Sequence, residues 1–128
     1  MICKELLNLR SCDWIGRDCL HLYRSCGKIG DMGASDLLGR IGGEEVAALL
    51  IDVSAAAGLQ VAERLRKSVQ TLASCTDDER RVELTVSIGL AKRQYKEESL
   101  AQLMKRADTA MYQAKAAGRN RIATDPTV

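Results

Sequence analysis

Apolar residues alternate with other residues from 82 to 91, in a pattern of period two. Such alternation predicts a half-buried strand with one face against the core. Two further apolar runs, at 37–41 and 44–51, also predict strands. Gly42 and Gly43 between them suit a tight hairpin, because glycine adopts positive φ freely. The alternating positions are Val82, Leu84, Val86, Ile88 and Leu90.

Two later segments carry apolar residues at helical spacing. Ser54 and Ser99 precede them and are good helix caps, since a serine hydroxyl can accept a hydrogen bond from a free amide of the first turn. Gly118 fits the position just past the end of the second helix, and the segment 119–124 predicts a short final strand. The apolar positions are Leu59, Ala62, Leu65, Val69 and Leu72 in the first helix, and Leu100, Leu103, Met104, Ala107, Met111 and Ala114 in the second.

The first 35 residues have a weaker pattern. Cysteines recur every seventh residue at 12, 19 and 26, which is compatible with one face of a helix over 13–27. Four glycines between 16 and 33 dilute that pattern, and no clear strand is predicted before residue 36.

The predicted order from residue 36 is strand, hairpin, strand, helix, strand, helix and short strand. This order predicts an α+β fold, with a central mixed or antiparallel sheet flanked by helices. A chain of 128 residues suits one domain, in which we distinguish a divergent segment, 1–35, from a core, 36–124.

Composition limits the class of protein. The net charge of +2 is too small to indicate nucleic acid or an anionic membrane as the partner. No apolar run approaches the roughly 20 residues that span a bilayer, and the charged N-terminus lacks a signal-peptide core, so we expect a cytoplasmic protein. Five cysteines and one histidine without a C-x-x-C pair favour small core residues over a redox or zinc site.

Two groups of residues could carry chemistry. Gly42 and Gly43 precede Glu44 and Glu45, and such carboxylates can bind Mg²⁺ on a nucleotide, although a plain polar hairpin tip is an equally simple interpretation. Lys115 and Arg119 are four residues apart, which on a helix puts them on one face. Their positive charges could either compensate the helix dipole or clamp a triphosphate.

Four segments together, "DLLGRIGGEEVAALL", "AERLR", "TVSIGLA" and "LMKRADTAMYQAKAAGRNR", resemble the GGDEF domain of the diguanylate cyclase family in order and spacing. The resemblance covers about residues 34–124. It implies an activity that joins two GTP molecules into cyclic di-GMP and releases pyrophosphate. It also implies a homodimer with one GTP in each subunit, Mg²⁺ or Mn²⁺ on the triphosphate, a palm-like fold related to nucleotide cyclases, and an upstream sensory domain in relatives.

The resemblance assigns roles to the hairpin residues. Gly42, Gly43, Glu44, Glu45 and Val46 match the family signature. The glycines would admit the nucleotide. Glu44 would bind the metal and serve as candidate base for the attacking 3′-hydroxyl, with Glu45 as the second catalytic carboxylate. Val46 replaces the usual phenylalanine, and we expect it to point inward and to cost packing rather than chemistry.

Other positions are assigned in the same way. Lys115 and Arg119 match the phosphate-contacting pair, and Asp18 lies at about the right distance to contact the guanine. Active members begin with a strand that carries a metal-binding aspartate, whose place falls at or before Met1 here. Asn8 fits the guanine-contacting asparagine only with a shifted register. We therefore expect an N-terminally truncated or divergent member that lacks a clear first strand, which would leave its neighbours with unpaired backbone groups.

The family's product-binding site is also altered. Asp36 is retained and Arg64 matches a second arginine of that site, but Gly33 stands where the family has its first arginine. Loss of a guanidinium predicts weak product inhibition. Two functions stay open: a diguanylate cyclase, and a catalytically inactive GGDEF-like module that binds nucleotide or a protein partner.

Overall fold

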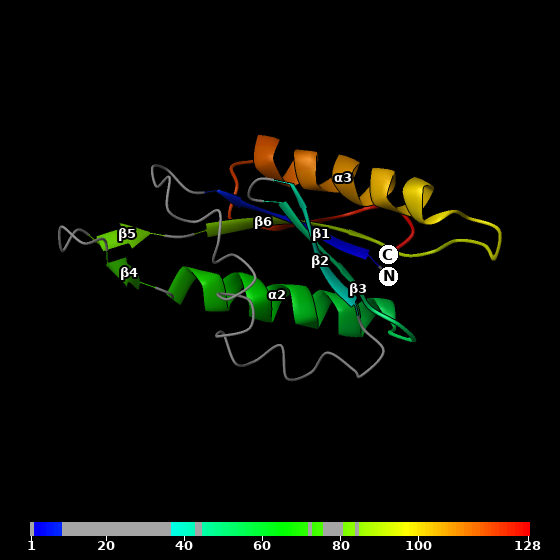
Figure 1. Ribbon diagram of the computed structural model, residues 1–128, viewed down its shortest axis with the longest axis horizontal. Helices are drawn as coiled ribbons and strands as arrows, with labels where there is room; N and C mark the ends of the chain where they lie inside the picture. The colour runs from blue at the N-terminus through cyan, green and yellow to red at the C-terminus, as the bar shows by residue number, and fades with distance from the viewer. Residues whose placement is uncertain (1, 9–36, 43–44, 72, 76–80, 84) are drawn as a thin grey trace.

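A five-stranded sheet lies between two helices, with α2 on one face and α3 on the other (Figure 1). The computed structural model describes residues 2–8, 37–42, 45–71, 73–75, 81–83 and 85–128. The elements are β1 (Ile2–Asn8), β2 (Leu37–Gly42), β3 (Glu45–Leu49), α2 (Ala55–Thr71), β4 (Ala73–Cys75), β5 (Arg81–Glu83), β6 (Thr85–Ala91), α3 (Leu100–Ala116) and β7 (Ile122–Thr124).

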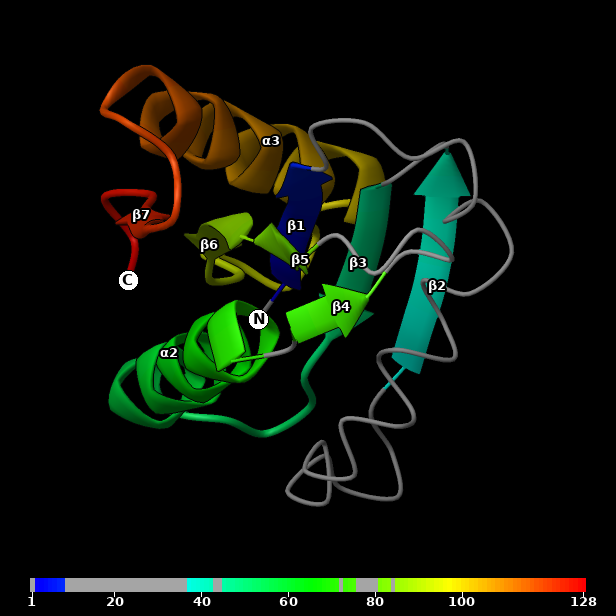
Figure 2. The same ribbon diagram turned by 90° about the vertical axis from the view of Figure 1, so that its left-hand side faces the viewer.

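The strand order of the large sheet is β2-β3-β1-β6-β7, and β4 and β5 form a separate antiparallel pair. The first four strands of the large sheet are antiparallel to their neighbours, whereas β7 is parallel to β6. Figure 2 shows the two helices on opposite sides of these strands. The predicted α+β fold with a mixed sheet flanked by helices is confirmed.

The prediction that no clear strand precedes residue 36 was wrong. β1 is the central strand, paired along its length with β6 and over Ile2–Leu6 with β3. Its sequence, ICKELLN, has leucines and charged residues that favour helix and shows no alternation. Pairing on both sides decides its conformation, as tertiary context often does for a short strand. The sheet therefore has the first strand that the sequence did not reveal.

The face toward α2 holds the larger apolar cluster. Even-numbered residues of β3 and β6, and Leu50 directly after β3, are buried there against α2, together with partly buried Leu65. These residues are Val46, Ala48, Leu50, Val86, Ile88 and Leu90, which meet Ala62 and Val69 of the helix. The predicted inward positions Val86, Ile88 and Leu90 are thus confirmed, whereas Val82 lies on the separate strand β5 and Leu84 lies outside the described residues.

β6 is buried on its second face as well, so the prediction of a half-buried strand was wrong. Ser87, Gly89 and Ala91 face α3 and are buried. A Cβ on Gly89 would lie 2.0 Å from the carbonyl oxygen of Ala107 and 2.3 Å from the backbone nitrogen of Met111. Small residues therefore allow α3 to lie directly on the strand, a contact that a period-two pattern does not reveal.

Both predicted caps are present. The Ser54 hydroxyl accepts from the Ala57 amide at 3.2 Å, and Ser99 forms a reciprocal capping box with Gln102. Two predicted core positions were wrong: Leu59 is 37% exposed and Leu100 is 56% exposed. Each lies in the first two turns of its helix.

Candidate functional site

The β2–β3 hairpin brings the signature glutamate to one end of the sheet. Gly42 pairs with Glu45, and the register of β2 shifts between Arg40 and Gly42. Among the described residues, positive φ occurs at Gly118 but not at Gly42, so the prediction of positive φ at Gly42 was wrong. The bulge changes the register without requiring a left-handed glycine there.

Glu45 lies on the α3 side of the sheet. Its neighbour Val46 is 1% exposed and belongs to the α2-side cluster, and successive residues of a strand point to opposite faces. Glu45 is half-buried and pairs with Leu6 of β1, which on its other side pairs with Ser87 of β6. The carboxylate thus lies at the hairpin end, level with the last residues of β1. The prediction that Val46 points inward is confirmed.

The carboxyl end of α3 lies toward this same end of the sheet. In Figure 1 the carboxyl ends of β1 and α3 lie toward the same end of the sheet as the β2–β3 hairpin turn, and Figure 2 shows the end of α3 and the hairpin on opposite sides of β1. Lys115 is half-buried in the last turn of α3, and Arg119 is exposed in the turn that follows. The structure therefore places Glu45, Lys115 and Arg119, three residues of the predicted site, toward one end of the sheet.

Lys115 and Arg119 do not share a helical face, contrary to the prediction. α3 ends at Ala116, and the Gly118 and Arg119 amides bond back to the carbonyls of Lys115 and Ala114. This is the pattern of a Schellman cap, in which a left-handed residue ends the helix. Gly118 has φ +118°, which confirms its predicted role.

The turn after α3 has an unusual backbone. Positive φ continues from Gly118 through Arg119 (φ +62°) and Asn120 (φ +46°). A side chain rarely tolerates this region, although asparagine does so more often than most residues. The turn ends at Arg121, whose carbonyl accepts from the Ile88 amide of β6 at 2.9 Å.

Arg66 of α2 contacts this turn, and the sequence analysis missed it. Its guanidinium donates to the Asn120 side-chain oxygen at 2.9 Å and to the Asn120 carbonyl at 3.4 Å. Glu63 accepts two bonds from it, at 2.8 and 2.9 Å, and Gln70 accepts one at 3.1 Å. The hydrogen bond from Arg66 lowers the pKa of Glu63. The available signal was the second arginine of "AERLR", two residues after the arginine that the resemblance singled out.

The other predicted residues are only partly placed. Gly43, Glu44, Asp18 and Asp36 lie outside the described residues, as does the predicted helix over 13–27. Arg64 is exposed on α2. Within the described part of the chain, no group of three or more His, Cys, Asp and Glu side chains could hold a metal ion. Among the described residues, Glu45 is thus the carboxylate that the hairpin itself offers to a metal.

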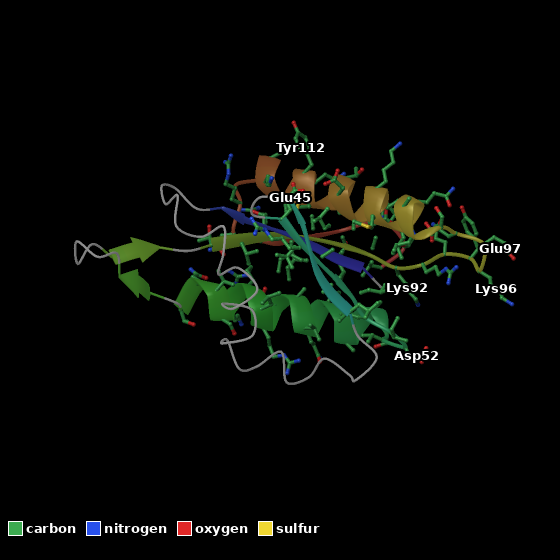
Figure 3. The ribbon with its side chains drawn as sticks, in the orientation of Figure 1. Glu45, Asp52, Lys92, Lys96, Glu97 and Tyr112 are labelled. Atoms are coloured by element: carbon green, nitrogen blue, oxygen red, sulfur yellow. The ribbon has the colours of Figure 1, made fainter. Side chains whose placement is uncertain are left out.

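A second polar cluster lies at the opposite end of the sheet. Arg106 of α3 bonds to buried Glu98 at 2.8 Å and to Asp125 at 2.6 Å. It also donates to the Thr127 hydroxyl and to the Lys92 carbonyl. Figure 3 shows Lys92, Lys96 and Glu97 at this end, away from Glu45. We call this set the Arg106 cluster; it joins the C-terminal residues to the loop between β6 and α3.

Comparison with known proteins agrees with this geometry. The sequence model of the family described as "Diguanylate cyclase, GGDEF domain" matches residues 29–121. Diguanylate cyclase A of Treponema denticola is 39% identical over 101 residues, covering 79% of this chain and 26% of that protein. Response regulator PleD of Caulobacter vibrioides is 37% identical over 90 residues, covering 70% of this chain and 20% of that protein. The chain belongs to the GGDEF diguanylate cyclase family, and it spans about a quarter of the length of these relatives or less.

Solved structures show the same fold. The GGDEF domain of DgcB from Caulobacter crescentus, in complex with c-di-GMP, has a TM-score of 0.72 at 25% identity and covers 97% of this chain and 77% of that one. Diguanylate cyclase SiaD, in complex with its activator SiaC from Pseudomonas aeruginosa, has a TM-score of 0.75 at 28% identity and covers 96% and 49%. Among the described residues, no helix is long and apolar enough to cross a membrane.

Proposed function

We propose that this chain is a single diguanylate cyclase domain that acts as a homodimer, with one GTP in each subunit. The observation that carries the proposal is the register of the signature hairpin, which pairs Glu45 with Gly42. This pair lies toward the same end of the sheet as the carboxyl end of α3. Family membership supports the same activity. GTP is then the substrate, and cyclic di-GMP and pyrophosphate are the products.

In the proposed reaction, the 3′-hydroxyl oxygen of each GTP attacks the α-phosphorus of the other. Each attack forms one phosphodiester bond, breaks one bond to the β-phosphate, and releases one pyrophosphate. Glu44 or Glu45 accepts the hydroxyl proton, as a carboxylate at the reacting edge can do. Mg²⁺ or Mn²⁺ held by Glu44, with Glu45 beside it, and by the triphosphate would neutralise phosphate charge.

The cations at the end of α3 have a separate role in this proposal. Lys115 provides a compact positive charge, and Arg119 provides a planar fork that matches phosphate oxygens. Gly42 leaves its backbone accessible, because among the described residues other than its chain neighbours no atom lies within 4 Å of where a Cβ would be. Together these features favour a triphosphate that lies across this end of the sheet, with its α-phosphate toward Glu45.

The test is incubation of the purified chain with GTP and Mg²⁺, followed by chromatography for cyclic di-GMP. We expect product, and we expect Glu45→Ala to lower the rate by about 100-fold or more, since such groups stabilise charge in the transition state. Glu97→Ala is the matched control, because Glu97 is an exposed glutamate at the opposite end of the sheet (Figure 3). It should leave the rate unchanged.

The second candidate is an inactive GGDEF-like module that binds GTP or a protein partner. The observation that favours it is that the described residues contain no ready group of metal ligands. SiaD was solved with an activator protein, so a protein partner has a precedent in this fold. A folded sample that binds GTP but yields no cyclic di-GMP would select this candidate and reject the first.

A further inference from the structure

Three consecutive residues with positive φ form the turn that presents Arg119. Arg119 has a Cβ, so its φ of +62° is a conformation that the turn must impose. The Schellman bonds fix Gly118 and the Arg119 amide from the α3 side. The next residue, Asn120, is held by a side chain from a different helix, Arg66 of α2.

The guanidinium of Arg66 is also held by a residue of its own helix. Glu63, one turn earlier on α2, accepts from both Nε and Nη2 of the guanidinium, so the fork is bidentate. This leaves Nη1 aimed at Asn120 and Gln70. Arg66 is only 16% exposed, whereas Lys67 beside it is 67% exposed and forms a longer ion pair with Glu63, at 3.6 Å.

From these contacts we propose that Arg66 is a positioning residue: its bonds to Asn120 fix the turn that presents Arg119 to the triphosphate. The inference rests on the proposed function, because it takes Arg119 as the phosphate contact. Arg66 touches no reacting atom in this account. It acts by preventing Asn120, and with it Arg119, from leaving the left-handed region when no ligand is bound, so that binding does not have to order the turn.

The first test is the affinity for α,β-methylene GTP, measured by calorimetry with Mg²⁺ present. We expect Arg66→Gln to weaken binding by about tenfold, as loss of a preorganised charged contact would. In an Arg119→Ala background the same change should weaken binding by less than about twofold, since the two residues would act as one unit. Lys67→Gln is the matched control, with one positive charge removed from the same turn of α2, and should bind like the wild type.

Two results would overturn the inference. One is binding by Arg66→Gln within twofold of the wild type. The other is a full loss that persists without Arg119, which would mean that Arg66 acts by some other route. If Arg66→Gln does not fold, Asn120→Gly replaces it, because glycine keeps access to positive φ and removes the side-chain amide that accepts from Arg66. It should give the same loss and the same dependence on Arg119.

Amide hydrogen exchange tests the inference even if the proposed function is wrong, because it needs no bound nucleotide. If the wild type binds no α,β-methylene GTP, the proposed function fails, and exchange of the Arg119 amide decides the inference. That amide bonds to the Ala114 carbonyl at 3.0 Å. Arg66→Gln should accelerate its exchange by about tenfold or more while amides of β6 stay protected. An unchanged Arg119 rate would reject the positioning role.

Discussion

The two ends of the central sheet are held by different kinds of arginine contact. At the end away from the hairpin, Arg106 binds Glu98 and Asp125, whose side chains are 2% and 13% exposed. At the hairpin end, Arg66 binds Glu63, which is 40% exposed, and the amide oxygen of Asn120. The first cluster has two largely buried carboxylates, whereas the second has one partly exposed carboxylate and neutral amide oxygens.

This difference suggests that one cluster mainly stabilises the fold and that the other mainly sets the conformation of the turn that holds Arg119. A buried carboxylate that loses its cation is costly, so the Arg106 cluster should govern the free energy of unfolding. An ion pair that water can reach contributes little, so the Arg66 contacts should matter mainly for the conformation of one turn. The arginine contacts at the two ends should therefore differ in how much they contribute to the free energy of unfolding.

The largest expected effect is at the contact that both ends share, where α3 lies on β6. Gly89→Ala should destabilise the fold by more than about 3 kcal/mol, because the added carbon would meet backbone atoms that no side-chain rotation can move. Urea unfolding followed by circular dichroism measures this. Gly39→Ala is the control, since nothing lies within 4 Å of a Cβ there. Similar midpoints for the two variants would contradict the proposed close contact.

Arg106→Gln should have the next largest effect, a loss of about 3 kcal/mol in the free energy of unfolding. The reason is that Glu98 would stay buried without its cation. The same urea titration serves, with Lys105→Gln as the control because Lys105 is exposed on the adjacent position of α3. A loss below about 1 kcal/mol would show that water reaches Glu98 and that the two ends do not differ.

Arg66→Gln should cost only about 1 kcal/mol in unfolding free energy, since its carboxylate partner is partly exposed. The comparison is sharpest when both arginine variants are measured in one buffer. A loss as large as that of Arg106→Gln would mean that Arg66 is a general stabilising residue, and the separation between the two ends would not hold.

The smallest of the expected effects is the loss of stability in acid through the Arg106 cluster. Burial raises the pKa of Asp125, but bonds from Thr127 and the charge of Arg106 outweigh this and lower it overall. A lowered carboxyl pKa stabilises the fold above the ordinary value of about 4, and that contribution is lost as the pH falls below it. Thermal melts between about pH 6 and pH 3 should show a smaller acid decline for Asp125→Asn than for the wild type. Parallel declines would contradict this.

Much of the fold could be predicted from residue 37 onward because its local signals agree with one another. Ser54, Ser99 and Gly118 mark helix ends by chemistry that acts within a few residues. β1 could not be predicted, since ICKELLN has no periodicity and becomes a strand only through pairing with β3 and β6. The burial of both faces of β6 was missed for a similar reason, because α3 covers Ser87 and Gly89 from far along the chain.

The place of the candidate residues in the fold was predictable where a motif is contiguous. The hairpin signature led directly to Glu45, and the segment around Lys115 and Arg119 led to the end of α3. The contact between Arg66 and Asn120 was not predictable, because the two residues are 54 positions apart. The expectation that Lys115 and Arg119 share a helical face failed, because the helix ends before Arg119, at the Gly118 cap.

The central claim is that the hairpin end, and not the Arg106 end, binds GTP. Two-dimensional NMR of the chain, titrated with α,β-methylene GTP and Mg²⁺, tests it most directly. We expect the amides of Gly42, Glu45 and Arg119 to shift progressively while those of Lys92 and Asp125 stay in place. Shifts confined to Lys92 and Asp125, or no shifts at millimolar nucleotide, would contradict the claim.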